Sequence, residues 1–247
     1  MRSKHQKKVA LITGGTNGIG SEIAKTFVNN DYKVLITGTN KKKIDLINSK
    51  NNSDFRAFQS DFKDNESLKK LIQKLNRINK IDVLVNNAGI NKIDNFIKTK
   101  NKDFSMIQSV NLKAPYQISK CVIKKMEKNN FGRIVNISSI FGKLSRGKRS
   151  LYSMSKFGLH GLTVSLSAEL SNKNILTNTV SPGFINTDLT KRILSKKEMK
   201  DLARNVPIGR FGEPEEIARL VLFLCSEENS YITGQNIFID GGFTIVW

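Results

Sequence analysis

Short apolar runs rich in Val, Ile and Leu recur along this chain and alternate with longer segments whose apolar residues repeat at helical spacing. The runs are largely apolar without alternation, which is typical of strands that are covered on both faces. Strands of that kind, joined by helices, form a parallel sheet between two helix layers. The sequence therefore predicts a doubly wound α/β fold whose strands lie in residues 8–13, 33–38, 55–60, 81–87, 132–138, 175–182 and 235–240.

No boundary between domains is visible in the sequence. No stretch rich in Pro, Gly and Ser interrupts the chain, and its 247 residues with 38% hydrophobic content suffice for one large core. We expect a single domain over residues 1–247, with a cofactor-binding part in about 7–136 and a catalytic and substrate-binding part in about 137–247. Residues 186–212 are the least strand-like, and we expect a lid or substrate loop there.

The chain is strongly basic. Its 41 Lys and Arg against 21 Asp and Glu give a formal charge of +20, which would suit an acidic partner. The lysines are scattered, however, and only ten of the basic residues are Arg, whereas nucleic-acid-binding surfaces are clustered and use Arg for bidentate contacts. We therefore interpret the charge first as a solvated surface and do not expect nucleic acid as a partner.

Neither a signal peptide nor a membrane span is predicted. The apolar run of residues 9–12 is too short for a signal peptide, and residues 220–225 fall far below the roughly 18 residues of a membrane span. Cys121 and Cys225 lie far apart in apolar helical stretches, as expected of free thiols in a reducing compartment. We expect a cytoplasmic protein that contacts no membrane.

A glycine-rich turn follows the first predicted strand. Residues 13–20 read TGGTNGIG, and a helical pattern begins directly afterwards. Glycines in a strand-to-helix turn let the backbone approach a pyrophosphate, whose charge the helix N-terminus stabilises. Because this turn lies in a βαβ unit, it indicates a dinucleotide site and not merely a flexible turn, with contacts from Gly14, Thr16, Asn17, Gly18, Ile19 and Gly20.

The end of the second strand indicates which dinucleotide is bound. An acidic residue there would accept hydrogen bonds from the ribose 2′-hydroxyl of NAD, but the chain has Thr39 and Asn40 followed by residues 41–43, KKK. The lysines attract a 2′-phosphate, so NADP (NADPH) is favoured over NAD, unless they form only a solvated helical turn. Asp61 and Phe62 follow the third strand; Asp61 is a candidate for the adenine amino group or a helix cap.

A candidate acid/base pair lies in the second half of the chain. Tyr152 and Lys156 are four residues apart, so they share one face of a helix. An ammonium near a phenol lowers the pKa of the phenol and makes it usable near neutrality. Ser139, at the end of a strand, is placed to hydrogen-bond a carbonyl oxygen on which charge develops. Asn111, in a helical region, is placed to hold a water that relays protons to Lys156.

Two other classes of function are disfavoured. With only two histidines, His5 and His160, a histidine-ligated zinc site or a His-based triad is hard to build, so no metal site is predicted. A non-catalytic module that senses a dinucleotide or binds nucleic acid remains a remote alternative. It would be favoured by the loss of Tyr152 or Lys156, and neither is missing.

Taken together, these motifs resemble the short-chain dehydrogenase/reductase family over about residues 7–242. They appear in the family's order as TGGTNGIG, NNAG at 86–89, Asn111, Ser139, YSMSK at 152–156, Pro182-Gly183 with Thr187, and DGG at 240–242. The resemblance implies a Rossmann-like seven-stranded sheet, a homo-oligomer that is usually a tetramer, and a catalytic tetrad of Asn111, Ser139, Tyr152 and Lys156.

The resemblance also implies further cofactor contacts. Lys156 is expected to bind nicotinamide ribose hydroxyls next to Tyr152. The stretch after the fourth strand and the stretch after the sixth strand are expected to line the cofactor, through Asn87, Ala88, Gly89, Pro182, Gly183, Ile185 and Thr187. The aromatic end of the chain, Phe243 and Trp247, is expected to pack at a subunit interface or beside a neighbour's site.

Within this family the chain is most similar to 3-oxoacyl-acyl-carrier-protein reductases of fatty acid biosynthesis. That likeness implies reduction of a carrier-bound 3-oxoacyl thioester, with an acidic acyl carrier protein as a possible partner for the basic surface. The chain departs from these reductases in two places. Residues 147–151, GKRSL, precede Tyr152 where such reductases typically have a Gly-Gln pair and an Asn, which weakens the substrate assignment. Asn17 stands where they commonly have Arg, which weakens the preference for NADP, and Lys148-Arg149 lie at the mouth of the predicted site. A small-molecule sugar, polyol or nucleotide-sugar substrate therefore stays open, as does a solvated loop for the basic pair.

Overall fold

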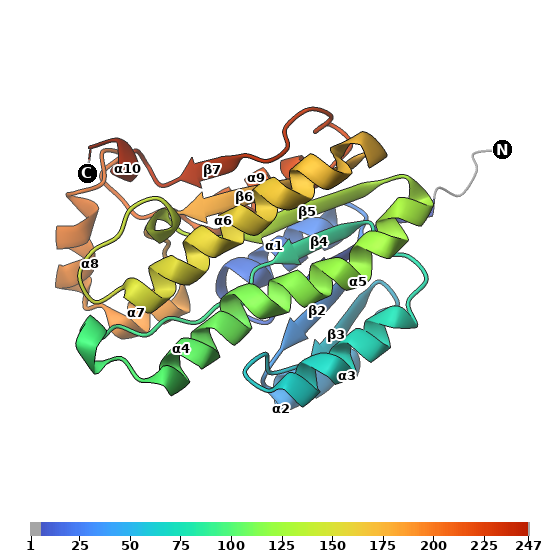
Figure 1. Cartoon of the computed structure of the whole chain (residues 1–247), viewed down its shortest axis with the longest axis horizontal. Coiled ribbons are helices and arrows are strands. Elements are labelled where there is room, and N and C mark those ends of the chain that lie inside the picture. Colours follow the sequence, from blue (N-terminus) through green and yellow to red (C-terminus); the bar gives the residue numbers. More distant parts are fainter. Residues whose placement is uncertain (1–5, 247) are drawn as a thin grey trace.

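The structure is a computed structural model that describes residues 6–246. Its core is a seven-stranded, all-parallel sheet in the order β3-β2-β1-β4-β5-β6-β7 (Figure 1). The predicted single-domain doubly wound α/β fold is confirmed, and each predicted strand forms. The strands are β1 Val9–Ile12, β2 Lys33–Gly38, β3 Phe55–Gln59, β4 Val83–Asn86, β5 Gly132–Ile137, β6 Ile175–Pro182 and β7 Asn236–Ile239.

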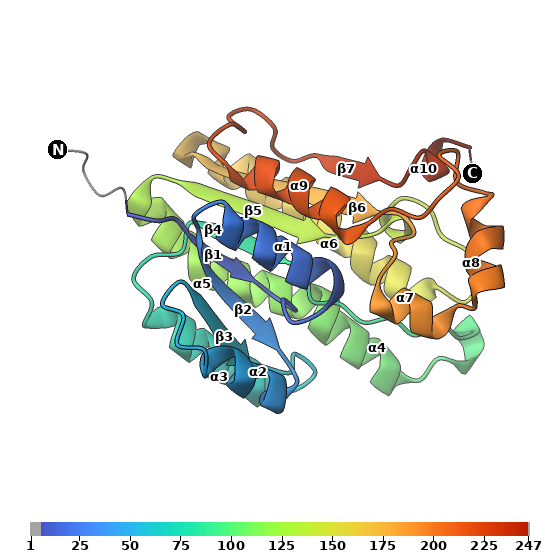
Figure 2. The same ribbon diagram turned by 180° about the vertical axis from the view of Figure 1, so that it is seen from behind.

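Helices cover both faces of the sheet. In Figure 1, α4, α5 and α6 lie in front of the strands, and Figure 2 shows α1 and α9 side by side on the opposite face. The α-helices are α1 Gly18–Asn29, α2 Lys41–Asn48, α3 Asn65–Asn76, α4 Asn101–Gln108, α5 Ala114–Asn129, α6 Ser150–Leu170, α7 Asp188–Ile193, α8 Lys196–Ala203, α9 Pro214–Cys225 and α10 Phe243–Val246. Short helical turns are η1 Phe96–Lys98, η2 Ser109–Lys113, which is a π-helix, η3 Ile140–Gly142 and η4 Ser171–Lys173.

Two apolar clusters fill the space between the sheet and its helices. On one face Phe27 of α1 and Val221 of α9 pack against β1 and β4, and on the other Leu71 of α3 and Val122 of α5 do so. All four of these side chains are fully or almost fully buried. Covering both faces is what the largely unbroken apolar strand sequences require.

The strand order reverses between β1 and β4, and this reversal places the site. From β1 the chain winds outward to β2 and β3, then crosses back to β4 on the other side of β1. The loops after β1 and β4 therefore diverge and leave a crevice at the carboxyl edge of the sheet, where ligands of doubly wound sheets bind. Helices α7 and α8 lie beyond the same edge (Figure 2), within the stretch expected to form a lid or substrate loop.

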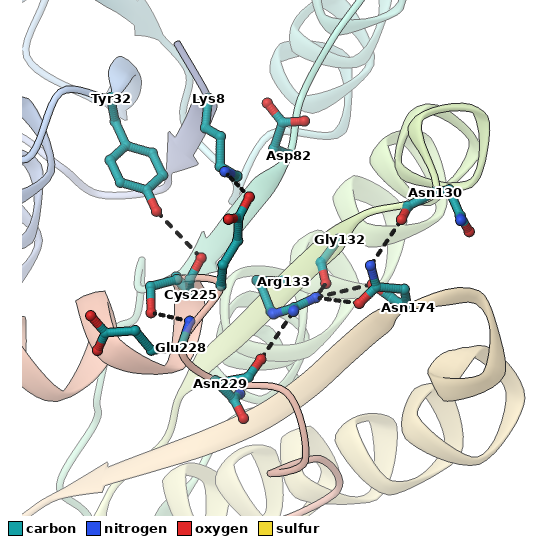
Figure 3. A network of polar contacts seen from close by, with 12 residues as sticks. Lys8, Tyr32, Asp82, Asn130, Gly132, Arg133, Asn174, Cys225, Glu228 and Asn229 are labelled. Carbon is teal, nitrogen blue, oxygen red and sulfur yellow. Dashed lines mark hydrogen bonds and ion pairs between the residues drawn. The ribbon is translucent and has the colours of Figure 1, made fainter. Parts of the chain in front are cut away.

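A buried arginine holds the opposite, amino edge of the sheet. Arg133, at the start of β5, is 3% exposed, and burial lowers its pKa. Its guanidinium donates hydrogen bonds to the carbonyls of Gly132, Asn174 and Asn229 at 2.8, 3.0 and 3.0 Å (Figure 3). The three acceptors belong to β5, the turn before β6 and the loop after α9. Arg133 therefore ties these segments together away from the crevice.

The carboxyl-terminal segment packs against its own subunit. Phe243 is 4% exposed and meets the ring of Phe184 edge-on at 5.2 Å, in a cluster with Ile140, Phe141 and Val206. Phe243 is thus already buried within its own chain, and packing of the aromatic end at a subunit interface or beside a neighbour's site stays a prediction. Trp247, named with it, lies outside the described residues. None of the helices within residues 6–246 combines the length and the apolar character that crossing a membrane requires.

Candidate active site

The glycine-rich turn is shaped by backbone conformations and close contacts that only glycine accommodates. Gly14 and Gly18 have φ values of +66° and +53°, in the left-handed region. A Cβ on Gly20 would collide with the amide of Asn87 and lie 2.5 Å from the carbonyl oxygen of Gly14. The turn then leads into α1, whose first turn contains no acidic residue. Its free N–H groups at the positive end of the helix suit an anionic ligand.

Thr13 joins the glycine-rich turn to the loop after β4. Its hydroxyl accepts hydrogen bonds from the backbone N–H groups of Asn87 and Ala88, both at 3.0 Å. The side chain of Asn87 donates in return to the carbonyl of Thr13 at 2.9 Å. Two loops whose bonded residues are 74 positions apart in the sequence are thereby fixed side by side. The structure thus brings the predicted residues Asn87–Gly89 to the predicted pyrophosphate turn.

Lys43 reaches from α2 back to the glycine-rich turn. Asn40 caps α2 by accepting a hydrogen bond from the backbone of Lys43, and the Lys43 ammonium donates to the side-chain oxygen of Asn17 at 2.7 Å. It also donates to the carbonyl of Thr16. A surface hollow beside the turn is lined by Lys43 and by Thr187, among others. Of the three lysines in the run, Lys43 is the one that meets the cofactor turn.

Thr39, Asp61 and Phe62, the other residues predicted at the adenine end, differ in which of their groups a ligand can reach. Thr39 is exposed at the end of β2. One carboxylate oxygen of Asp61 accepts the backbone N–H of Lys63 at 3.0 Å, whereas α3 is capped by Asp64, so Asp61 is not the helix cap. Phe62 is 5% exposed within the core, which leaves its backbone as the part available to a ligand.

The stretch after β6 lies against the glycine-rich turn. Pro182 ends β6, and Gly183 lies so close to Asp240 that a Cβ would approach it to 2.8 Å. Ile185 is buried and forms an isolated parallel bridge with Gly212. Thr187 caps α7, and its side chain would lie 3.7 Å from a Cβ on Gly18. The segment that carries α7 therefore meets the predicted phosphate site directly.

Ser139, Tyr152 and Lys156 converge at the carboxyl end of β5. Ser139 begins the turn η3 by accepting a hydrogen bond from Phe141, and Tyr152 and Lys156 lie on one face of α6. The ammonium of Lys156 lies 5.6 Å from the centre of the Tyr152 ring and donates to the carbonyl of Ile137 at 2.8 Å. Ser139 lies close enough to Tyr152 to lower the pKa of its phenol. Tyr152 and Lys156, which were predicted to share a helix face, are thus in contact.

The electrostatics of the pair differ from the prediction. Burial raises the pKa of Tyr152, and the neighbouring Ser139 and the charge of Arg149 oppose that rise only in part. Burial also lowers the pKa of Lys156, to about 8. The prediction that the pKa of Tyr152 lies below its ordinary value is therefore wrong, because loss of solvation outweighs the nearby charges.

Asn111 lies in the π-helical turn between α4 and α5, and its side chain is fully engaged. Its carbonyl oxygen accepts the N–H of Ile90 at 2.8 Å, and its amide donates to the carbonyl of Ile90 and to the hydroxyl of Ser155, both at 2.9 Å. Asn111 therefore fixes the loop after β4 to α6. Turns of this kind inside α-helices occur often at functional sites.

The arrangement fits a nicotinamide dinucleotide. The buried Lys156 ammonium has three donors but only one acceptor within residues 6–246, so hydroxyl groups of a bound ribose would satisfy the others. A Cβ on Gly89 would lie 3.5 Å from that ammonium, so the absence of a side chain at Gly89 keeps the approach open. No group of three His, Cys, Asp or Glu in this part of the chain could hold a metal ion.

Comparison with known proteins agrees with this geometry. A family model described as Enoyl-(Acyl carrier protein) reductase matches residues 14–244. The 3-oxoacyl-[acyl-carrier-protein] reductase FabG of Aquifex aeolicus is 40% identical over 247 residues, covering 98% of this chain and 99% of that protein. The chain belongs to the short-chain dehydrogenase/reductase family. The FabG of Rickettsia conorii is 39% identical over 239 residues and covers 97% of this chain and 98% of the relative.

Solved structures support the same assignment. The structure titled "4-hydroxyisoleucine dehydrogenase complexed with NADH" aligns with a TM-score of 0.90 at 31% identity, covering 97% of this chain and 99% of that one. The structure titled "ElxO with NADP Bound" aligns with a TM-score of 0.89 at 34% identity and covers 97% and 100%. This short-chain dehydrogenase/reductase is an NAD(P)-dependent oxidoreductase that acts on a CH–OH/C=O pair.

Three residues that matter to the site were not predicted as site residues. Thr13 was part of the glycine motif, but its role depends on a loop far along the sequence. The sequence does not show which of the three lysines faces the glycine-rich turn, because that depends on how α2 is rotated about its axis. Ser155 lies inside the YSMSK motif at a buried position, where it holds Asn111. The only signal that the sequence offers for Ser155 is its place next to Lys156 in this motif.

Proposed function

We propose that this enzyme reduces the ketone of a 3-oxoacyl thioester with NADPH. The observation that carries the proposal is the convergence of Tyr152, Ser139 and Lys156 at the crevice that the glycine-rich turn enters. The chain's near full-length similarity to two proteins named 3-oxoacyl-[acyl-carrier-protein] reductase supports the substrate class. The cofactor would be held by the turn at 14–20, by Asn87–Gly89, by Lys156, and by Ile185 and Thr187.

The chain's own residues would handle the oxygen of the ketone. Ser139 donates a hydrogen bond to that oxygen and holds it beside Tyr152. When bound, the reduced nicotinamide supplies the hydride that forms the new C–H bond at the carbonyl carbon. Tyr152 gives its hydroxyl proton to the oxygen, which becomes the alcohol. Asn111, whose side chain is occupied, would hold a proton-relaying water only through its backbone carbonyl.

The role of proton donor requires Tyr152 to be protonated at neutral pH. A phenol whose pKa lies above its ordinary value keeps its proton at neutral pH and is ready to donate it. The ammonium of Lys156 then stabilises the phenolate that remains after the transfer.

Lys43 supports the preference for NADPH. It is a cation that meets the glycine-rich turn at Asn17, the position where similar reductases commonly have Arg. We predict that Lys43→Gln lowers kcat/KM for NADPH by about tenfold, as expected for loss of one charge-assisted contact, while NADH is little affected. The exposed neighbour Lys42, changed to Gln, is the matched control. An equal loss with both cofactors would contradict this assignment.

We further propose a cytoplasmic homo-oligomer, expected to be a tetramer, that accepts its substrate on an acidic acyl carrier protein. Exposed apolar side chains on neighbouring helices support self-association; they are Phe104 of α4, Tyr116 of α5, and Met154, Phe157 and Val164 of α6. The free thiols Cys121 and Cys225 suit a reducing compartment. Light scattering of the purified protein measures the mass, and a monomer would contradict the oligomer.

The substrate and cofactor are tested together by measuring oxidation of NADPH and NADH in the presence of an acetoacetyl thioester. Rapid oxidation of NADPH, with much slower oxidation of NADH, is the expected result. Tight binding of NADPH without turnover of any acyl thioester would remove the substrate assignment and leave the family intact.

A further inference from the structure

An unneutralised group of basic side chains stands at the mouth of the site. Between Ser139 and Tyr152 the chain carries four cations, Lys143, Arg146, Lys148 and Arg149. Within residues 6–246 none of the four forms an ion pair with a carboxylate, although ten such pairs occur elsewhere in that range. Asp94 contacts Lys148 through the backbone, where the N–H of Asp94 donates to the carbonyl of Lys148.

Two of these cations share one aromatic ring. The guanidinium carbons of Arg149 and Arg146 lie 5.2 and 5.8 Å from the centre of the Phe141 ring, so they are no further apart than those distances combined, about 11 Å. Phe141 in turn meets the Tyr152 ring edge-on at 6.4 Å. Arg149 is half-buried, and burial together with the charge of Arg146 lowers its pKa. The ring thus holds two like charges beside the catalytic phenol.

The location of the pair is electrostatically unfavourable for folding. Arg149 occupies the N-cap position of the 21-residue helix α6, its side chain makes no cap hydrogen bond, and the first turn of α6 contains no acidic residue. Cations are destabilising at the positive end of a helix, where anions are favoured. Departures from such local preferences are expected mainly at functional sites. A bound anion would offset both the repulsion between the arginines and the charge at the helix end.

We propose that Arg149, together with Arg146, binds a carboxylate or phosphate group that the substrate carries close to its reacting ketone. The proposal rests on the ketone reduction proposed above and adds a second class of substrate, compact anionic ketones, beside the carrier-bound thioester. The guanidinium of Arg149 supplies paired N–H donors to the oxyanion, and the Phe141 ring holds the guanidinium in place. Arg149 is therefore a substrate-binding residue, not a proton donor.

Distance restricts where that anion is attached. The Phe141 ring centre lies 5.2 Å from the guanidinium carbon of Arg149 and 6.4 Å from the centre of the Tyr152 ring. The guanidinium carbon is therefore at most about 12 Å from the centre of the Tyr152 ring. The phosphodiester of a carrier-protein arm is separated from the 3-oxo group by about sixteen bonds, roughly 18 Å when extended. The pair therefore fits a compact anionic ketone better than the phosphate of an extended prosthetic arm.

Matched charged and neutral ketones test the proposal. NADPH oxidation is measured with 4-oxopentanoate against its methyl ester, and with dihydroxyacetone phosphate against dihydroxyacetone, which separates carboxylate from phosphate recognition. The ratio of kcat/KM within each pair is the readout, because any general effect of a substitution on Tyr152 cancels. Arg149→Gln is compared with Arg56→Gln, since Arg56 lies at the same 5.2 Å from the ring of Phe58 on the edge strand β3.

The expected result is a preference for the anionic ketone of about tenfold or more in at least one pair, lost in Arg149→Gln and kept in Arg56→Gln. A ratio near one in the unmodified enzyme, or a ratio unchanged by Arg149→Gln, overturns the proposal while ketone reduction stands. If no ketone is reduced, the proposed reaction fails, and titration of inorganic phosphate decides the anion site alone. Equal phosphate affinity in the unmodified and Arg149→Gln proteins would then overturn it.

Discussion

Burying Lys156 costs stability, and this cost should depend on pH in a defined way. Lys156 is 3% exposed, has one hydrogen-bond acceptor, and has its pKa lowered by burial from 10.5 to about 8. The unfolded chain, in which the amine is solvated, retains the ordinary value. Replacement of Lys156 by Met keeps a long apolar side chain of similar shape and removes the titrating group.

The sign of the effect follows from the protons bound in each state. Below pH 8 the amine is protonated in both states and the folded protein bears the full cost of burying the charge. Between pH 8 and 10.5 the unfolded chain binds a proton that the folded protein lacks, so the free energy of unfolding rises with pH. From a pKa of about 8 in the folded protein and 10.5 in the unfolded chain, the rise between pH 7 and pH 9.5 is about 2 kcal/mol.

The assay is urea unfolding at several pH values from 7 to 9.5, followed by circular dichroism. The difference in the free energy of unfolding between the unmodified protein and Lys156→Met isolates this group, because the other titrating residues are common to both. That difference should change by about 2 kcal/mol in favour of the unmodified protein as the pH rises. Lys128→Met, at an exposed position near the end of α5, is the control. A difference that stays constant over this range would refute the reasoning.

Two further predictions concern the two edges of the sheet. Gly20→Ala should raise the Kd for NADPH, measured by fluorescence titration, by at least about tenfold. The added Cβ displaces the Asn87 side chain from the carbonyls of Thr13 and Gly14. An unchanged Kd would contradict the described turn. Arg133→Met should lower the free energy of unfolding by about 3 kcal/mol, because it removes the buried guanidinium that donates to the carbonyls of Gly132, Asn174 and Asn229. KM should not change in that variant, and an altered KM would mean that the amino edge communicates with the site.

The sheet could be predicted from the sequence because its signal is local. Two predicted strands, at 33–38 and 175–182, have the observed bounds, since segments rich in Val, Ile, Leu and Thr between turn residues leave few alternatives. The strand order could be expected only through the family resemblance. Its cause is a set of long-range contacts, such as the register of Ala10 between Val34 and Val83, that no short segment encodes.

The site was predicted unevenly for the same reason. Helical spacing fixes the contact between Tyr152 and Lys156, so it could be foreseen. The pKa of Tyr152 could not, because burial is a property of the folded chain and here outweighs the nearby charge. The link between Thr13 and Asn87 and the choice of Lys43 among three lysines likewise depend on how distant elements meet.

The central claim is that Tyr152 donates the proton to the reduced carbonyl. It is tested by measuring, in Tyr152→Phe and in the unmodified enzyme, both the Kd for NADPH and the rate of NADPH oxidation with an acetoacetyl thioester. The account predicts a Kd within about twofold of the unmodified value and a kcat lowered by about 10² to 10⁴, the range for loss of a general acid. A kcat that falls less than about tenfold would contradict the assignment of Tyr152 as the acid.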